Sequence, residues 1–424
     1  MSEPRVLAIV LAGGKGSRME VLTEARAKPT LPFGGVFSLL DIVMSNARNS
    51  RIDDVWVVLQ YHSSSVDPVL AHGRPWDLDR SRGGLRVLQP QEGLGTDEDG
   101  MAAGNSDCLF RFRGIIEEFA PDLVFVLSAD HAYTLDFREV VKAHLATAAE
   151  CTVVTSVFAA EEAGNHTLVH TSQGGRTSAS DHGQQVTRIE HKPDEVSTDT
   201  VATEVFLYDA HVLLEVLQGL FDALPEGEHL GDFGEDLLPA LVARGKTYAY
   251  HLPGYWRDLG RPAAYLAAHR ELLDGEVDIF DDPDWPILTA TEQRPGARVT
   301  GAGVVNDSMI AAGCHIEGTV ERSVLGLGVR VGAGAHVRDS IIMSDTVIRE
   351  NAQIDWSIVD TRVTVGADAR VGSAMKPRTG ERVRSESIAL VGRGARIDGG
   401  AVVDSGDRIT PGARRRRSTA TTRQ

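Results

Sequence analysis

The sequence predicts two domains: a doubly wound, mostly parallel α/β sheet, followed by a C-terminal left-handed parallel β-helix. Its 424 residues are too many for one compact hydrophobic core, so two domains are expected. Up to about residue 270, apolar strand-length runs alternate with helix-length segments, which is typical of βαβ units. From about residue 300, apolar residues recur in steps of 17, which indicates a repeat architecture.

Four apolar runs rich in β-branched residues define the expected strands of the first domain, which spans residues 1–275. They are residues 6–12, 55–60, 123–128 and 152–158. Helical periodicity predicts helices at 37–49 and 137–149. Because ligands of doubly wound sheets bind beyond the carboxyl ends of the strands, the loops that follow the strands are the candidate binding segments.

The second domain is expected over residues 298–405, after a proline-rich acidic linker at 276–297. Three columns of aliphatic residues predict coils of three short strands, each with one inward side chain. The columns are Val331, Ile348 and Val365; Val320, Val337, Ile354 and Val371; and Leu325, Ile342 and Val359. Cys314 lies one step before Val331 in the first column. Residues 406–424, which include four consecutive arginines, are expected to form a disordered basic tail.

Charge and composition exclude several classes of partner. The formal net charge of −17 argues against nucleic acid, because an acidic surface does not attract a phosphate backbone. The N-terminus does not read as a signal peptide, and no apolar run reaches the length of a membrane span. Three widely spaced cysteines show no metal-ligand spacing and suit a reducing compartment. A cytoplasmic protein without a membrane partner is therefore expected.

A glycine-rich segment with two cations follows the first expected strand. It reads Gly13-Gly14-Lys15-Gly16-Ser17-Arg18. Its glycines let the backbone approach a ligand closely, and its successive N–H groups can form a nest for an anion. Its spacing fits neither the P-loop nor the dinucleotide-binding fingerprint. A phosphate site is therefore favoured over a plain turn.

Together with this loop, a series of motifs resembles the glucose-1-phosphate adenylyltransferase (ADP-glucose pyrophosphorylase) family, from about residue 5 to about residue 392. They follow the family's order: Leu11-Ala12-Gly13-Gly14, Arg26-Ala27-Lys28-Pro29, Asp130-His131, Asp232-Phe233-Gly234, Tyr255-Trp256-Arg257-Asp258 and Asp284-Trp285-Pro286. The resemblance implies a Rossmann-like nucleotidyltransferase that converts ATP and glucose 1-phosphate to ADP-glucose and pyrophosphate. It also implies a role in glycogen biosynthesis, a homotetramer and allosteric control.

The resemblance assigns roles to the residues at matching positions. The implied nucleotide-binding residues are Leu11, Ala12, Gly13, Gly14, Lys15, Gly16, Gln91, Gly104 and Asn105. The implied sugar-phosphate-binding residues are His191, Lys192, Glu204 and Asp232. The implied catalytic residues are Arg18, Lys28 and Asp130. Arg18 would contact the leaving pyrophosphate, and Lys28 would neutralise the phosphate under attack.

Asp130 and Asp258 are the candidate ligands of Mg²⁺. Asp130 follows an expected strand, and Asp258 lies in an aromatic and basic motif far along the chain. A single aspartate after a strand is often only a helix cap. Two carboxylates that converge from separate segments are better explained by Mg²⁺, which takes oxygen ligands and water against phosphates.

The sequence departs from the family pattern around the sugar. His191 stands where the family has Glu before Lys-Pro, and Glu204 stands where it has Gly. Glu204 adds bulk and negative charge where a sugar phosphate is expected. Three functions therefore stay open: an active enzyme for glucose 1-phosphate, an enzyme for another sugar 1-phosphate, or a weak paralogue that regulates alone or in a mixed oligomer.

The β-helix raises one further class of enzyme. Such solenoids occur in acyltransferases that use a catalytic histidine and acyl-coenzyme A, for which His315 and His336 are the candidates. Both adjoin core columns and are expected to point outward into solvent. A scaffold that packs on the catalytic domain and on a partner subunit is the favoured role.

Overall fold

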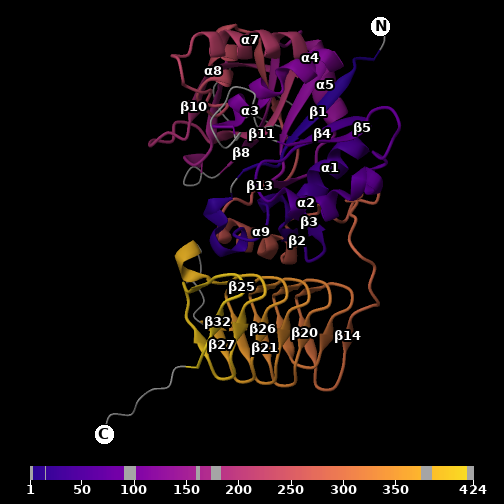
Figure 1. The fold of residues 1–424 in the computed structure, drawn as a ribbon, viewed down its shortest axis with the longest axis vertical. Helices are drawn as coiled ribbons and strands as arrows, with labels where there is room; N and C mark the ends of the chain where they lie inside the picture. Colours follow the sequence, from indigo (N-terminus) through magenta and orange to yellow (C-terminus); the bar gives the residue numbers. More distant parts are fainter. Residues whose placement is uncertain are drawn as a thin grey trace.

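The computed structural model describes residues 3–14, 16–89, 102–158, 163–172, 183–373 and 384–417. It confirms the expected fold class: an α/β domain lies at one end of the molecule and a coiled stack of short parallel strands at the other (Figure 1). In this part of the chain, no helix is long and apolar enough to cross a membrane.

A mixed β-sheet forms the centre of the first domain. Its described strands lie in the order β5 (Gly84–Leu88), β4 (Asp54–Val58), β1 (Val6–Leu11), β6 (Leu123–Ser128), β11 (Thr200–Asp209), β8 (Cys151–Val157), β12 (Thr247–His251), β10 (Gln184–His191) and β9 (Thr167–Thr171). The neighbours β5, β4, β1 and β6 are parallel, whereas β11 runs antiparallel to β6 and β8. The parallel half therefore presents several carboxyl strand ends at one edge.

Helices cover both faces of this sheet. On one face lie α1 (Leu39–Asn49), α2 (Ser63–Leu70) and α5 (Phe137–Ala146). On the other lie α3 (Asn105–Arg111), α4 (Arg113–Phe119), α7 (Ala210–Asp222) and α8 (Leu237–Ala243). Strand β1 shows why two cores form: Ala8 and Val10 pack on the first face, whereas Leu7 and Ile9 pack on the second. This alternation follows from the two-residue period of a strand.

Several expected boundaries shift by one to three residues. Helix α1 begins at Leu39, because Ser38 and Asp41 form a capping box and Phe37–Ser38 is strand β3, paired with β2 (Pro32–Phe33). Helix α5 ends at Ala146, three residues before the expected end, and Ala148 has the left-handed φ of +48°. Such a conformation stops a helix.

Three parallel sheets form the β-helix. The first contains β14 (Arg298–Val299), β17 (His315–Ile316), β20 (Arg330–Val331), β23 (Val347–Ile348), β26 (Thr364–Val365), β29 (Arg396–Ile397) and β32 (Arg414–Arg415). The second contains β15 (Val304–Asn306), β18 (Thr319–Glu321), β21 (His336–Arg338), β24 (Gln353–Asp355), β27 (Arg370–Gly372) and β30 (Val402–Val403). The third contains β16 (Met309–Ile310), β19 (Val324–Leu325), β22 (Ile341–Ile342), β25 (Ser357–Val359), β28 (Ala389–Val391) and β31 (Arg408–Ile409).

The predicted columns agree with the strand register except at one end. Val331 pairs with Ile348, and Ile348 pairs with Val365. The residue below Val331 is Ile316 rather than Cys314, because the coil there is shorter. Cys314 is nevertheless buried in the same core, and its thiol donates to the carbonyl of Gly326. The candidate acyltransferase residues His315 and His336 are both exposed.

The expectation of a disordered tail from residue 406 is wrong for residues 406–417. Strands β31 and β32 complete further coils there. Two arginines of the basic run are paired with carboxylates: Arg414 with Asp398, and Arg415 with Asp407. A run of like charges predicts a solvated tail, but acidic residues of the coils nearby pair with two of these arginines and neutralise their charge.

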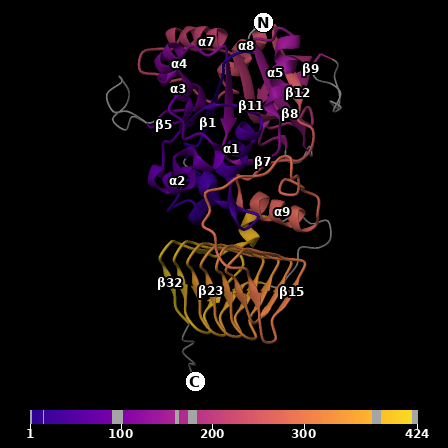
Figure 2. The same ribbon diagram turned by 90° about the vertical axis from the view of Figure 1, so that its right-hand side faces the viewer.

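The two domains share a hydrophobic core. It joins Met19, Phe33 and Tyr265 of the first domain to Met343 and Trp356 of the β-helix. Helix α9 (Pro262–Leu273) and the expected linker lie at this junction (Figure 2). Buried charges cross it as well, because Arg26 forms an ion pair with Asp360. The β-helix is therefore packed against the α/β domain through both apolar and charged contacts.

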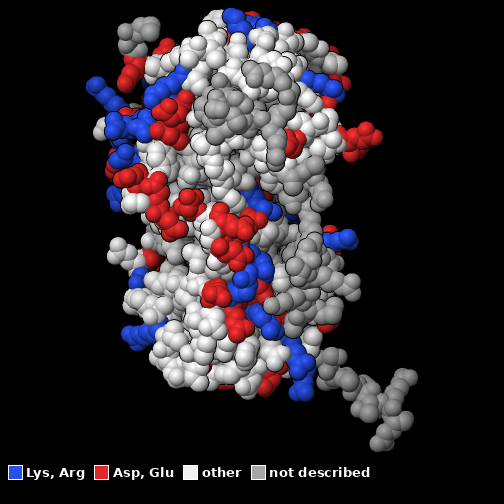
Figure 3. Space-filling view, turned by 180° about the vertical axis from the view of Figure 1, so that it is seen from behind, with Lys and Arg blue, Asp and Glu red and all other residues white. Residues whose placement is uncertain are grey.

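Surface charge is mixed on the face shown in Figure 3. Acidic and basic side chains lie interspersed over both domains there. The three cysteines, Cys108, Cys151 and Cys314, are free thiols and are buried.

Candidate active site

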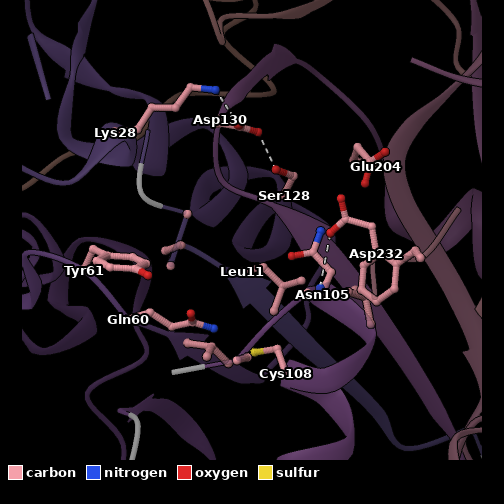
Figure 4. A pocket seen from close by; sticks show the side chains of 18 of the residues that line it. Leu11, Lys28, Gln60, Tyr61, Asn105, Cys108, Ser128, Asp130, Glu204 and Asp232 are labelled. Atoms are coloured by element: carbon pink, nitrogen blue, oxygen red, sulfur yellow. Dashed lines mark hydrogen bonds and ion pairs between the residues drawn. The ribbon is translucent and has the colours of Figure 1, made fainter. Parts of the chain in front are cut away.

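Two adjoining cavities lie at the carboxyl edge of the parallel strands. The larger, of about 340 Å³, is lined by Leu11, Ala12, Gly13, Gly14, Lys28, Gln60, Tyr61, Gly104, Asn105, Cys108, Ser128, Asp130, Glu204 and Asp232, among others (Figure 4). The smaller, of about 170 Å³, is lined by Arg18, Asp130, His131, His166, Thr167, His191, Lys192, Glu204, Asp232 and Asp258, among others. The two cavities share Asn105, Ser128, Asp130, Glu204, Asp232 and Phe233. This is the position at which doubly wound sheets bind their ligands.

The glycine-rich loop borders the larger cavity directly after β1. A Cβ at position 13 would lie 2.8 Å from Gln60 Cγ, so Gly13 is required by close packing. Gly16 has φ +66° and begins the 3₁₀-helix Ser17–Leu22, which carries Arg18. Glycine adopts this left-handed conformation without penalty. The loop therefore brings the backbone of Gly13 and Gly14 to one cavity and Arg18 to the other.

Lys28 and two aspartates meet where the cavities join. Lys28 follows the loop in the 3₁₀-helix Lys28–Thr30 and is buried. Its Nζ lies 2.5 Å from Asp130 Oδ2 and 3.7 Å from Asp258 Oδ1. The aspartates converge because β7 (His131–Tyr133) pairs with β13 (Trp256–Asp258), which places Asp258 opposite His131. Ser128 donates a hydrogen bond to Asp130.

His131 is the third member of this cluster. Its Nδ1 lies 3.1 Å from the carbonyl oxygen of Thr203, and because a carbonyl only accepts, Nδ1 carries a proton. Its Nε2 faces Asp130 Oδ1 at 3.2 Å and Asp258 Oδ1 at 3.7 Å. The contact with Asp130 is favourable when Nε2 is protonated or when a cation lies between the two groups.

Electrostatics keep the aspartates ionised. Burial opposes the charge of Asp130, but Lys28 and His131 hold its pKa well below its usual range. Burial likewise opposes ionisation of Asp258, and the same two neighbours lower its pKa. Both groups are therefore carboxylates at neutral pH.

The cluster fits a divalent cation. One ligand atom from each of Asp130, His131 and Asp258 can be chosen so that all lie within 4.8 Å of one another. Asp258 Oδ1 is buried and has no hydrogen-bond partner among the residues that the structure describes. Since Mg²⁺ prefers oxygen ligands, Asp130 and Asp258 are the members suited to it, and His131 is better suited to orienting Asp130.

The smaller cavity holds the four residues expected at the sugar phosphate. Lys192 Nζ lies 3.5 Å from Asp232 Oδ2, and the backbone N–H of Asn105 donates to Asp232 Oδ1 at 3.4 Å. His191 Nδ1 contacts Thr167 Oγ1 at 3.1 Å. Burial, together with the nearby Lys192, lowers the pKa of His191, which favours the neutral ring.

The structure gathers most of the residues predicted from the sequence. Two of them, Lys15 and Gln91, lie outside the described residues. Gly16 supports the loop and does not line either cavity. Sequence reasoning assigned no role to Ser128, His131 or Gln60. Ser128 and His131 each lie within two residues of Asp130, so adjacency to the predicted metal ligand was the available signal.

Comparison with known proteins defines the class of protein. Residues 7–275 match the family described as nucleotidyl transferase. Residues 295–391 match the GlmU-like C-terminal hexapeptide family. The α/β domain with its strand-edge cavities is thus a nucleotidyltransferase domain, and the second domain is a hexapeptide β-helix.

Individual relatives show to which family within the nucleotidyl transferases the chain belongs. A glucose-1-phosphate adenylyltransferase of Acetivibrio thermocellus is 33% identical over 420 residues, 97% of this chain and 94% of the relative. Its counterpart in Thermomicrobium roseum is 35% identical over 412 residues, 96% of this chain and 93% of the relative. That of Geobacillus stearothermophilus is 34% identical over 340 residues, 79% of this chain and 83% of the relative. The chain belongs to the glucose-1-phosphate adenylyltransferase family of nucleotidyl transferases.

Proposed function

We propose that the protein converts ATP and glucose 1-phosphate to ADP-glucose and pyrophosphate. An oxygen of the sugar phosphate attacks the α-phosphorus of ATP in line. A new phosphorus–oxygen bond forms, and the bond to the β-phosphate oxygen breaks, so pyrophosphate leaves. This chemistry needs positioning and charge neutralisation rather than a covalent nucleophile. The observation that carries the proposal is the convergence of Lys28, Asp130 and Asp258 between the two cavities.

The residues divide between the two substrates. The larger cavity takes the nucleotide, with the backbone of Gly13 and Gly14 at the phosphates and Arg18 toward the leaving pyrophosphate. Gln60 brings an amide into this cavity, and an amide can both donate to and accept from a purine edge. Lys192 in the smaller cavity binds the phosphate of the sugar.

Lys28 neutralises the phosphate under attack, because its ammonium lies where the two cavities meet. Asp130 and Asp258 would hold Mg²⁺, which supplies further neutralisation of phosphate charge when bound. His131 and Ser128 hold the Asp130 carboxylate in place. A tetramer, allosteric control, a cytoplasmic location and a role in glycogen biosynthesis are proposed from family membership only.

Product analysis tests this function. The full-length protein is incubated with Mg²⁺, ATP and glucose 1-phosphate, and the nucleotide products are separated by anion-exchange chromatography. ADP-glucose and an equal amount of pyrophosphate are expected. If glucose 1-phosphate is not converted while ATP still binds, this proposal is wrong. If a panel of other sugar 1-phosphates is not converted either, a regulatory subunit becomes the better explanation.

A further inference from the structure

Glu204 has a backbone conformation that disfavours its side chain. Strand β11 changes register between Ala202 and Phe206, and Glu204 within this break has φ +57°. A left-handed conformation costs a residue other than glycine roughly 1–2 kcal/mol. The family pattern has glycine here, which avoids that penalty. The chain therefore keeps a strained backbone and adds a carboxylate to it.

This carboxylate lies at the boundary between the two cavities. Glu204 lines both of them, as do Asp130 and Asp232. Figure 4 shows the carboxylates of Glu204 and Asp232 pointing toward one another. The preceding residue, Thr203, accepts the hydrogen bond from His131. The position of Glu204 is thus tied to the centre that holds the reacting phosphate.

Glu204 differs from the other acids of the cavities, because among the described residues its side chain has no hydrogen bond or ion pair and interacts with the charge of Lys192 only at longer range. Asp130 and Asp258 face Lys28 and His131, and Asp232 faces Lys192. Burial, with the charges of Asp130 and Asp232, raises the pKa of Glu204 to about 8, although the charge of Lys192 opposes this rise.

Because its pKa is raised, Glu204 keeps its proton near neutral pH while the site is empty, and a cation beside it would favour the ionised form. A neutral sugar brings only the further negative charge of its phosphate, so it leaves Glu204 protonated and without a charged partner. An ammonium group on the sugar would favour loss of the proton and would pair with the carboxylate. Because Glu204 lies at the boundary with the nucleotide cavity, it is near the anomeric phosphate. The ring substituent closest to that phosphate is the one on C2.

We propose that Glu204 selects a 2-amino sugar 1-phosphate of the glucosamine 1-phosphate type over the neutral sugar, by pairing with its ammonium group. The proposal rests on the proposed function, since it specifies which sugar the same site accepts. Glu204 touches the substrate and acts as a specificity determinant, and the transfer itself is unchanged.

The test compares three sugars that differ only at C2. Initial rates with Mg²⁺ and ATP near neutral pH are measured for glucosamine 1-phosphate, glucose 1-phosphate and N-acetylglucosamine 1-phosphate, the last of which lacks the charge. The native protein is expected to favour glucosamine 1-phosphate in kcat/KM by about tenfold or more over both of the others. In Glu204→Gln this preference is expected to disappear.

Two further variants control the comparison. Glu204→Gly removes the charge and the backbone strain together, so it is expected to fold and to lose the preference as Glu204→Gln does. Glu226→Gln changes an exposed glutamate after α7 and is expected to keep the native preference. Thermal melting of each variant confirms that the proteins compared are folded.

The outcomes separate the two proposals. If the native protein turns over glucose 1-phosphate as well as glucosamine 1-phosphate, or if the preference survives in Glu204→Gln, the role of Glu204 is overturned while the proposed function stands. If no sugar is turned over, calorimetry measures the affinity of the protein for the same sugar phosphates. Tighter binding of glucosamine 1-phosphate that is lost in Glu204→Gln supports the inference without the function, and equal binding overturns both.

Discussion

The ammonium of Lys28 lies 2.5 Å from a carboxylate oxygen of Asp130, at the boundary between the two cavities. Lys28 comes from the segment after the glycine-rich loop, and Asp130 from the end of β6. The segment after the loop that borders the larger cavity is therefore linked electrostatically to the candidate metal ligand.

Lys28→Met tests this relationship. The substitution preserves an unbranched side chain but removes the charge that is proposed to neutralise the phosphate under attack. Loss of one such electrostatic group is expected to lower kcat by about 10²-fold or more. Pyrophosphate release at saturating ATP and sugar phosphate measures the effect. Lys142→Met removes an exposed lysine that pairs with Glu139 on α5, and it is expected to act like the native protein. An active Lys28→Met would contradict the assignment.

The pH dependence of stability should reflect Glu204. Its pKa rises from the ordinary 4.5 to about 8 in the folded protein, through burial and the charges of Asp130 and Asp232. Between these pH values the unfolded chain releases the proton and the folded protein keeps it, so stability falls as the pH rises from about 4.5 to about 8.

Glu204→Gln does not titrate, so its melting temperature relative to the native protein should increase across this range. Both proteins are melted from pH 5 to pH 8 in the absence of Mg²⁺ and nucleotide. A difference that is constant with pH would show that the Glu204 proton is held no more tightly than in the unfolded chain.

The end of the β-helix should contribute to stability and to nucleotide binding. Arg408 of β31 forms an ion pair with Glu20, two residues from Arg18. Deletion of residues 406–424 removes that contact with β31 and β32, and it should lower the melting temperature by about 5 °C or more and raise KM for ATP. Deletion of residues 418–424 alone is the control, since it leaves both strands in place. Equal melting temperatures for the two deletions would contradict a structural role.

The buried pair Arg26–Asp360 should hold the domains together. Both side chains are almost fully buried, and burial lowers the pKa of Arg26 to about 10. Arg26→Met leaves the Asp360 charge without its partner, which is expected to cost about 3–5 kcal/mol of unfolding free energy. Urea denaturation measures it, and the double variant with Asp360→Asn should recover part of the loss. No recovery would mean that packing, not charge, sets the effect.

Much of the fold follows from local patterns in the sequence. Stacked coils place residues such as Val331 and Ile348 on one axis, so a fixed step in the sequence becomes a column in space. The pattern failed where coil length changes, at Cys314, and where arginines pair with acids of neighbouring coils, at Arg414. Neither event has a signature in the local sequence.

The site was predictable in its components but not in its geometry. Motifs pointed to Asp130 and Asp258, yet their convergence depends on the pairing of β7 with β13. The His131 ring faces both aspartates because its Nδ1 donates a hydrogen bond to the carbonyl oxygen of Thr203. The left-handed backbone at Glu204 depends on a break in strand register. These are long-range events that periodicity does not encode.

The most direct test of the enzymatic account is pyrophosphate release by the native protein and by Asp130→Asn, measured with Mg²⁺, ATP and a sugar 1-phosphate that the native protein uses. Asparagine keeps the shape of the side chain but removes the charge that faces Lys28 and that is proposed to hold Mg²⁺. Turnover is expected to fall by at least about 10³-fold while the variant melts as a folded protein. Turnover within a few fold of the native rate would contradict it.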